Sequence, residues 1–270
     1  MIFDTHAHLN FSDFEKDRED LINNCLENDL GMINVGTNYL SSEKAVEIAQ
    51  KFSGVYAAVG LHPSNIASDF FKMKSEPEVS ENILEKGFAY ERYKALAGDK
   101  KVVAIGECGL DYWRRPKGAA KQEAFKQEQR DVFLRQIDLA VDLGLPMIIH
   151  CREAFAETIG MLQGKKARGV IHCFTGNMEE AETFVSLGFY LGLNGIIFKA
   201  DLSEVISKIP LDRFLVETDC PYLSPPELAG KRNDPFSIEY VIKEVAKIKG
   251  ITVEEVAATT ASNTGKLFSI

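Results

Sequence analysis

The sequence predicts an α/β protein built as a (β/α)8 barrel, because eight short apolar segments alternate with segments of helical periodicity along 270 residues. The apolar segments are almost continuously hydrophobic, which is typical of parallel strands buried on both faces. Polar residues able to bind metal ions follow several of these segments, at the barrel face where active sites lie.

The eight predicted strands are Ile2–His6, Met32–Val35, Val55–Val59, Val102–Ile105, Met147–His150, Val170–Cys173, Phe189–Leu193 and Phe214–Glu217. An open, doubly wound sheet is the alternative arrangement for this order of elements. No glycine-rich phosphate fingerprint follows the first strand, which disfavours the dinucleotide-binding form of that sheet.

The clearest helical patterns cover Asp17–Asn28, Lys121–Leu143 and Phe236–Lys249, each with apolar residues recurring on one face. The last stretch, Thr252–Phe268, predicts a further pair of short helices. A capping box formed by Thr252 and Glu255 would begin the first of them.

We expect one domain over residues 1–270, with one long connection between the third and fourth strands at residues 64–101. This connection holds a charged, proline-containing stretch at 73–78 and a helical pattern at 80–96. A surface helix with a linker is one interpretation, and a lid near the site is the other.

The net charge of −9 argues against broad electrostatic binding to nucleic acid or to an anionic membrane, but not against a small local site. No apolar run reaches the length of a membrane span, and no signal peptide is evident. Five cysteines in a chain of this size predict reduced thiols and a cytoplasmic protein. No feature indicates an obligate protein partner.

All five histidines lie at the ends of predicted strands: His6, His8, His62, His150 and His172. Residues two apart on a strand face the same side, so the side chains of His6 and His8 point together into the barrel mouth. Two imidazoles placed in this way can chelate one transition-metal ion.

Two carboxylates complete the candidate ligand set, since Glu107 follows the fourth strand and Asp219 the eighth. With His6, His8, His150 and His172, they exceed what one four-coordinate ion binds. The pattern therefore predicts two divalent cations (Mg²⁺, Mn²⁺ or Zn²⁺) roughly 3.5–4 Å apart, with Glu107 as the bridging ligand. A buried ion pair is the alternative role for each carboxylate.

Strand alternation extends the predicted site by one layer. Asp4 and Glu217 share the inward face with His6 and Asp219, where a carboxylate commonly holds a ligand imidazole in its tautomer. A water-facing or buried-pair role is equally compatible with Asp4. One cysteine directly follows each of four proposed ligands, and alternation predicts that these thiols point outward beneath the helices. They are Cys108, Cys151, Cys173 and Cys220.

Six segments together resemble the TatD-type metal-dependent deoxyribonucleases, within the wider amidohydrolase-like barrels. They are Phe3–Leu9, Val59–Pro63, Ile105–Tyr112, Leu145–Ala154, His172–Gly176 and Glu217–Leu223. The resemblance implies two metals at the six ligands named above and 3′→5′ exonuclease action on DNA. It also implies substrate contacts from His62 and Arg152. The segment Phe70–Lys100 is bulkier than the family pattern.

In the expected mechanism, the metals lower the pKa of a bound water to about 7. Asp219 and Glu107 are the catalytic carboxylates, and Asp219 orients that water or accepts its proton. Tyr112 and Trp113 stand beside two arginines and would stack on bases, unless this loop is simply solvated.

Several basic residues favour a phosphate-bearing substrate: Arg114, Arg115, Lys117, Arg152, Lys199, Lys231 and Arg232. These patterns do not distinguish DNA from RNA as the substrate. An amide or ester hydrolase, or a D-aminoacyl-tRNA deacylase, with the same metal centre is the alternative function. A barrel that has lost its activity is disfavoured because every ligand position is filled.

Overall fold

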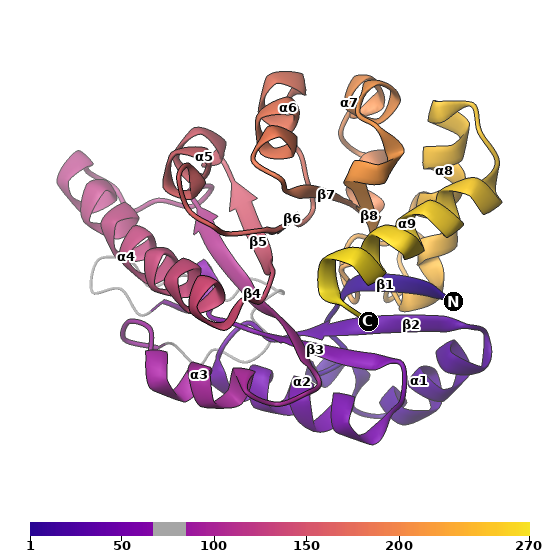
Figure 1. Cartoon of the computed structure of the whole chain (residues 1–270), viewed down its shortest axis with the longest axis horizontal. Helices are drawn as coiled ribbons and strands as arrows, with labels where there is room; N and C mark the ends of the chain where they lie inside the picture. Colours follow the sequence, from indigo (N-terminus) through magenta and orange to yellow (C-terminus); the bar gives the residue numbers. More distant parts are fainter. Residues whose placement is uncertain (67–84) are drawn as a thin grey trace.

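The computed structural model describes residues 1–66 and 85–270. Eight parallel strands pair in sequence order, and the helices lie outside them (Figure 1). A bridge between Ala7 and Cys220 joins the ends of the first and last strands. This arrangement confirms the predicted (β/α)8 barrel, and the strictly sequential strand order excludes the doubly wound sheet. The strands are β1 Ile2–Ala7, β2 Leu30–Val35, β3 Val55–Val59, β4 Val102–Asp111, β5 Met147–Arg152, β6 Gly169–Ile171, β7 Tyr190–Leu193 and β8 Phe214–Val216.

The α-helices begin and end close to the predicted positions where a strong apolar stripe exists. They are α1 Arg18–Glu27, α2 Tyr39–Lys51, α3 Tyr90–Ala97, α4 Ala119–Leu143, α5 Phe155–Leu162, α6 Met178–Ser186, α7 Ser203–Lys208, α8 Ile238–Lys249 and α9 Val253–Phe268. Short 3₁₀ turns connect several elements: η1 Ser12–Phe14, η2 Pro63–Asn65, η3 Gly195–Phe198, η4 Leu211–Arg213, η5 Pro226–Leu228 and η6 Pro235–Ser237.

Alternation along the strands divides the apolar core into two layers. One set of side chains faces the barrel interior, and the other set packs beneath the surrounding helices. The interior set comprises Ile33, Val35, Ala58, Val103, Ala104, Ile148, Val170 and Leu215. Leu267 and Phe268, from the end of α9, pack into the same interior cluster.

The prediction of two short helices at the C-terminal end was wrong, because α9 is a single helix. Two threonine hydroxyls donate along the helix to carbonyls four residues back: Thr260 to Val256 at 2.9 Å and Thr264 to Thr260 at 2.9 Å. The side chain of Asn263 is buried and donates to the carbonyls of Leu211 and Phe214. These polar residues therefore have partners, either in the helix itself or in the neighbouring segment, and the helix continues past them.

The long connection after β3 is described only in part. Helix α3 overlaps the predicted helical pattern at 80–96, whereas the charged stretch at 73–78 lies outside the described residues. The interpretation of this connection as a lid also rests largely on residues 67–84, which lie outside them. Within residues 1–66 and 85–270, no helix is long and apolar enough to cross a membrane.

We expect Thr252→Ala to lower the free energy of unfolding by about 1 kcal/mol, because it removes the N-cap of α9. The Thr252 hydroxyl accepts the backbone N–H of Glu255 at 3.1 Å. Urea denaturation should show a lower midpoint with an unchanged slope. Thr252→Ser keeps the hydroxyl and should retain most of the stability; equal losses in both variants would contradict the capping role.

Candidate metal centre

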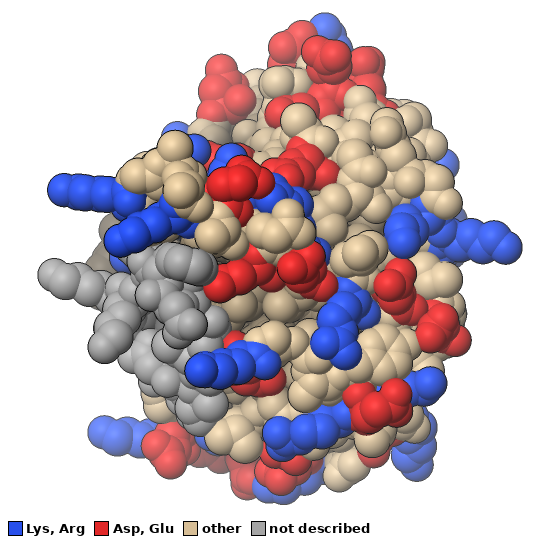
Figure 2. Space-filling model, turned by 90° about the vertical axis from the view of Figure 1, so that its left-hand side faces the viewer, with Lys and Arg blue, Asp and Glu red and all other residues tan. Residues whose placement is uncertain are grey.

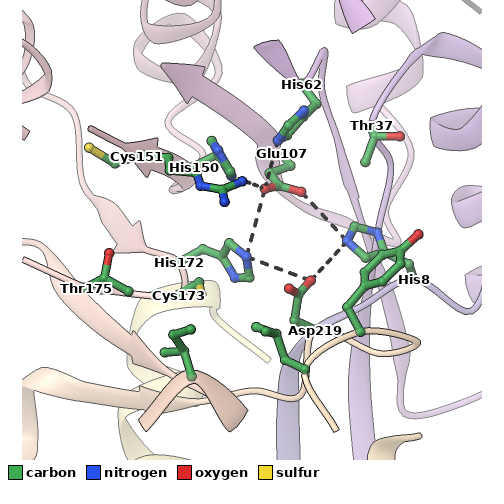
Figure 3. A pocket seen from close by; sticks show the side chains of 14 residues that line it. His8, Thr37, His62, Glu107, His150, Cys151, His172, Cys173, Thr175 and Asp219 are labelled. Atoms are coloured by element: carbon green, nitrogen blue, oxygen red, sulfur yellow. Dashed lines mark hydrogen bonds and ion pairs between the residues drawn. The ribbon is translucent and has the colours of Figure 1, made fainter. Parts of the chain in front are cut away.

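Five of the six predicted ligands line one cavity of about 170 Å³ at the C-terminal ends of the strands. The sixth, His6, is fully buried beside it, with its Nε2 3.1 Å from His8 Nε2. Figure 3 shows four imidazoles, from His8, His62, His150 and His172, arranged around the carboxylates of Glu107 and Asp219. Because the ligands come from β1, β4, β5 and the turns after β6 and β8, no short segment could build this centre alone.

Glu107 lies at the middle of the cluster, and its two carboxylate oxygens face different imidazoles. Oε2 is 3.3 Å from His6 Nε2 and 3.7 Å from His8 Nε2. Oε1 is 3.0 Å from His150 Nδ1, 3.4 Å from His62 Nε2 and 3.9 Å from His172 Nε2. Burial alone would raise the pKa of Glu107, but the surrounding imidazoles hold that pKa well below its usual range.

Asp219 reaches the cluster from a backbone turn. Its φ of +58° lies in the left-handed region, which aspartate adopts more readily than most residues, and its N–H donates to the His6 carbonyl at 2.8 Å. Oδ1 is 3.4 Å from His8 Nε2 and 3.8 Å from His172 Nε2. Burial opposes ionisation, yet His172 and His8 lower the pKa of Asp219.

The tautomers of two imidazoles make this cluster suitable for cations. His8 Nδ1 lies 2.9 Å from the Val35 carbonyl, which can only accept, so Nδ1 carries the proton. His172 Nδ1 lies 2.8 Å from Glu217 Oε1, and this carboxylate favours the same tautomer. In each neutral ring the Nε2 lone pair therefore faces carboxylate oxygens. The Nε2 lone pairs and the carboxylate oxygens repel one another, and a divalent cation bound between them would remove this repulsion. The donor set therefore fits the metal ions expected from the sequence.

His150 has a carboxylate beside each ring nitrogen. Nδ1 is 3.0 Å from Glu107 Oε1, and Nε2 is 3.0 Å from Asp111 Oδ2. Burial lowers the pKa of His150, but Asp111 and Glu107 together raise it to about 10. In the same way, Glu217 and Asp219 overcome burial and raise the pKa of His172 to about 9.

His62 differs from the other imidazoles in its tautomer. The backbone N–H of Ser64 donates to His62 Nδ1 at 3.1 Å, so the proton of the neutral ring lies on Nε2. Burial lowers the pKa of His62, which keeps the ring neutral. His62 Nε2 therefore presents an N–H to the cavity, although the ring lies in a candidate ligand group with Glu107 and His150.

The carboxylates of Glu217 and Asp4 occupy the layer below the ligands, with different contacts. Glu217 Oε1 lies beside the His172 ring and also accepts N–H groups from Cys173 and Asn194. Among the residues that the structure describes, Asp4 contacts no imidazole nitrogen; it accepts the backbone N–H groups of His6 and Thr218 and the Thr218 hydroxyl. Asp4 thus positions the backbone that carries two ligands, rather than a ring tautomer.

Three of the four cysteines are buried as strand alternation predicts, while Cys173 is not. Cys151 Sγ contacts the Thr158 hydroxyl of α5 at 3.3 Å, and Cys108 and Cys220 are fully buried. Cys173 is half-buried, lines the cavity and contacts Asn194. Its φ of +47° places it in a left-handed turn beyond β6, where alternation no longer applies.

The substrate contacts expected after β4 are only partly supported. Trp113 is 52 % exposed, and the Arg152 guanidinium lies over its ring at 4.7 Å. Arg152 also lines the cavity. Tyr112, the other residue expected to contact substrate, lies elsewhere: β4 continues to Asp111, and the Tyr112 side chain is buried against α4, with Lys126 over its ring.

The basic residues give weaker support for a phosphate-bearing substrate than the sequence suggested. Arg115 pairs with Glu153 at 3.0 Å, and Arg232 pairs with Asp17 at 2.5 Å. On the described part of the face in Figure 2, Lys and Arg side chains are interspersed with Asp and Glu. Attraction of an anion would therefore be local to the cavity.

Sequence reasoning missed Asp111 and two buried glutamines of α4. Gln129 exchanges two hydrogen bonds with the backbone of Asp111, at 2.8 and 3.0 Å. Gln136 does the same with Leu61, next to His62, at 2.8 and 3.0 Å. Gly109 lies so close to β5 that a Cβ would come within 2.0 Å of the His150 carbonyl. Asp111 could have been found, because it shares the inward face of β4 with Glu107.

A set of imidazole and carboxylate ligands at the mouth of a (β/α)8 barrel defines a metal-dependent hydrolase. The chain belongs to the family described as TatD related DNase, whose model matches residues 3–269. The family expected from the sequence motifs is thereby confirmed.

Relatives match over the full length. The chain is 37 % identical to the uncharacterized metal-dependent hydrolase YabD of Bacillus subtilis strain 168, over 100 % of both chains. It is 32 % identical to the 3′-5′ ssDNA/RNA exonuclease TatD of Escherichia coli K12, over 100 % of this chain and 99 % of the relative. The crystal structure of YjjV, a TatD homolog from Escherichia coli K12, matches with a TM-score of 0.82 at 27 % identity. That match covers 100 % of this chain and 98 % of the other.

We expect the metal-free protein to lose thermal stability as the pH rises from about 6.5 to above 9. The folded-state pKa values of His172 and His150, about 9 and about 10, exceed the value of about 6.5 in an unfolded chain. Their stabilisation is therefore fully present below about pH 6.5 and is lost as the pH rises through the folded pKa values.

Melting temperatures in excess chelator, measured from pH 6.5 to 9.5, should show this decline. His172→Asn should weaken the dependence, because it removes one of the two rings. A profile that stays flat in the metal-free protein would contradict the assigned charges.

Proposed function

We propose that the chain is a two-metal exonuclease that removes nucleotides from the 3′ end of single-stranded DNA, with RNA as a second substrate. The observation that carries this proposal is the position of the Trp113–Arg152 pair beside a cavity lined with metal-type ligands. An exposed aromatic ring with a guanidinium suits a nucleic-acid strand, since rings stack on bases and arginine pairs with phosphate. The TatD relative of Escherichia coli is likewise named a 3′-5′ ssDNA/RNA exonuclease.

The division of contacts around Glu107 supports two metal ions. Oε2 faces His6 and His8, whereas Oε1 faces His150 and His172, as expected of a carboxylate shared by two sites. His6, His8 and Asp219 would hold one ion, and His150 and His172 the other. Divalent ions bound there would supply a water of lowered pKa and would polarise the phosphate.

The side chains of the chain have distinct tasks in this proposal. Asp219, ionised at neutral pH because its pKa is lowered, accepts the proton of the attacking water. His62 donates its Nε2 proton to a phosphate oxygen, as its tautomer allows. Arg152 neutralises phosphate charge from the rim of the cavity. Glu217 and Asp4 hold the ligands in place from below.

A cytoplasmic location completes the proposal. All five cysteines are free thiols, which is typical of reducing compartments. An amide or ester hydrolase, or a D-aminoacyl-tRNA deacylase, is the competing function. Such an enzyme would turn over a neutral ester or a D-aminoacyl-tRNA faster than an oligonucleotide.

We expect exhaustive chelation to abolish cleavage of a 5′-labelled single-stranded oligonucleotide, and metal addition to restore it. Glu107→Gln keeps the side-chain shape but removes the shared negative charge, so its activity should fall by on the order of a hundredfold or more. Asp138→Asn changes an exposed carboxylate paired with Lys165 and serves as the control. Full activity of the chelated protein, or of Glu107→Gln, would refute a two-metal mechanism.

We expect Trp113→Ala to raise the KM for oligonucleotides about tenfold, because one stacking ring is worth about 1–3 kcal/mol. Trp113→Phe should retain part of the affinity. Bis(p-nitrophenyl) phosphate has no nucleobase, so its hydrolysis should be unchanged in both variants. If both substrates are affected equally, Trp113 does not stack on a base.

A further inference from the structure

Asp111 uses its two carboxylate oxygens on two different parts of the site. Oδ2 lies 3.0 Å from His150 Nε2, on the side of the candidate metal centre. Oδ1 accepts the backbone N–H of Trp113 at 2.9 Å, on the side of the expected nucleic-acid strand. One side chain therefore joins a candidate metal ligand to the exposed ring that would stack on a base.

The surroundings of Asp111 leave this link little freedom. Gln129 holds the Asp111 backbone through two hydrogen bonds. Arg152 is the register partner of Asp111 on β5, and its carbonyl accepts the N–H of Tyr112 at 2.9 Å. The Arg152 guanidinium then lies over the Trp113 ring. A shift of the His150 ring would thus be transmitted through Asp111 to the Trp113–Arg152 pair.

The contact of Asp111 also bears on which nitrogen of His150 can bind a metal. Each ring nitrogen has a carboxylate at 3.0 Å, but Glu107 is itself a candidate ligand. With Glu107 holding a metal ion, the proton of the neutral ring would stay on Nε2, beside Asp111. The lone pair then lies on Nδ1, the nitrogen that faces Glu107 Oε1 at 3.0 Å. The nitrogen of His150 that is available to a metal is therefore Nδ1. In His8 and His172 it is Nε2, because their Nδ1 atoms face Val35 and Glu217.

We propose that Asp111 is a positioning residue that couples metal binding at His150 to the seating of the Trp113–Arg152 pair. This inference rests on the metal centre of the proposed function. Coupling between two sites is reciprocal, so a bound strand should also strengthen metal binding. Metal-loaded protein would hold its stacking ring in place before the strand arrives.

The variant Asp111→Asn distinguishes the coupling role from a second role of Asp111, which is to accept the Trp113 N–H and so cap the turn after β4. Asparagine caps such turns as well as aspartate does, so the Trp113 N–H keeps its acceptor. The amide NH₂ group then faces His150 Nε2 and, as a donor, favours the lone pair on that nitrogen. The proton moves to Nδ1, where it blocks the atom that faces Glu107.

The experiment titrates metal-free protein with Zn²⁺ while recording the emission of Trp113, the only tryptophan of the chain. Bound zinc is measured in parallel by elemental analysis, and folding by circular dichroism. The unchanged protein and the Asp138→Asn control should bind zinc with a saturable change in emission. Asp111→Asn should keep the metal-free emission, bind zinc at least tenfold more weakly, and show no emission change when saturated.

The possible outcomes separate this inference from the proposed function. If the unchanged protein binds no zinc, the metal centre is refuted and the coupling with it. If it binds zinc and Asp111→Asn behaves identically, the centre stands and the coupling is refuted. An unchanged protein that binds zinc with no change in emission also refutes the coupling.

A second measurement leaves Asp111 intact, in case Asp111→Asn does not fold. A phosphorothioate oligonucleotide, which resists hydrolysis, should raise the zinc affinity of the unchanged protein severalfold. Trp113→Ala should lose this increase. Equal zinc affinities with and without the oligonucleotide in the unchanged protein would overturn the proposal.

Discussion

The site depends on one negative charge kept away from water. Glu107 is only 4 % exposed, and an isolated carboxylate in such a place is costly unless positive charge or hydrogen bonds match it. Four further strand ends supply the matching imidazoles, so the centre exists only when the barrel closes. The buried acids and amides behind the rings, such as Glu217 and Asn194, follow from the same need to satisfy every polar group.

Most of the fold could be predicted because the strands are buried on both faces and are therefore read as continuous apolar runs. The signal fails where burial has another cause. Strand β4 extends six residues beyond the predicted end at Ile105, through Glu107 to Asp111. These residues are buried by polar contacts at the barrel mouth, which hydrophobicity does not report. Helix α9, predicted as two short helices, is another case: its Asn263 is polar, yet its side chain is buried and donates to the Phe214 carbonyl.

The candidate ligands could be named from the sequence because each lies at the end of a strand, and Glu217 lies beside the His172 ring on the inward face that alternation predicts. Alternation failed at Cys173, where a left-handed turn ends the strand, and the direction of the Tyr112 side chain could not be predicted because the strand continues past its predicted end. Gln129 and Gln136 had no usable signal. A glutamine in an amphipathic helix normally faces water, and only the tertiary structure shows that these two amides are buried against backbone.

The two glutamines set a limit on how this protein can vary over evolution. They lie seven residues apart on α4, which is about 10 Å along a helix and nearly two full turns, so both amides reach the barrel from one helical face. One inserted or deleted residue between them would rotate one amide by about 100° and leave two buried backbone groups without partners. Helix α4 should therefore tolerate changes of length at its ends but not between these positions, even though neither glutamine contacts the cavity.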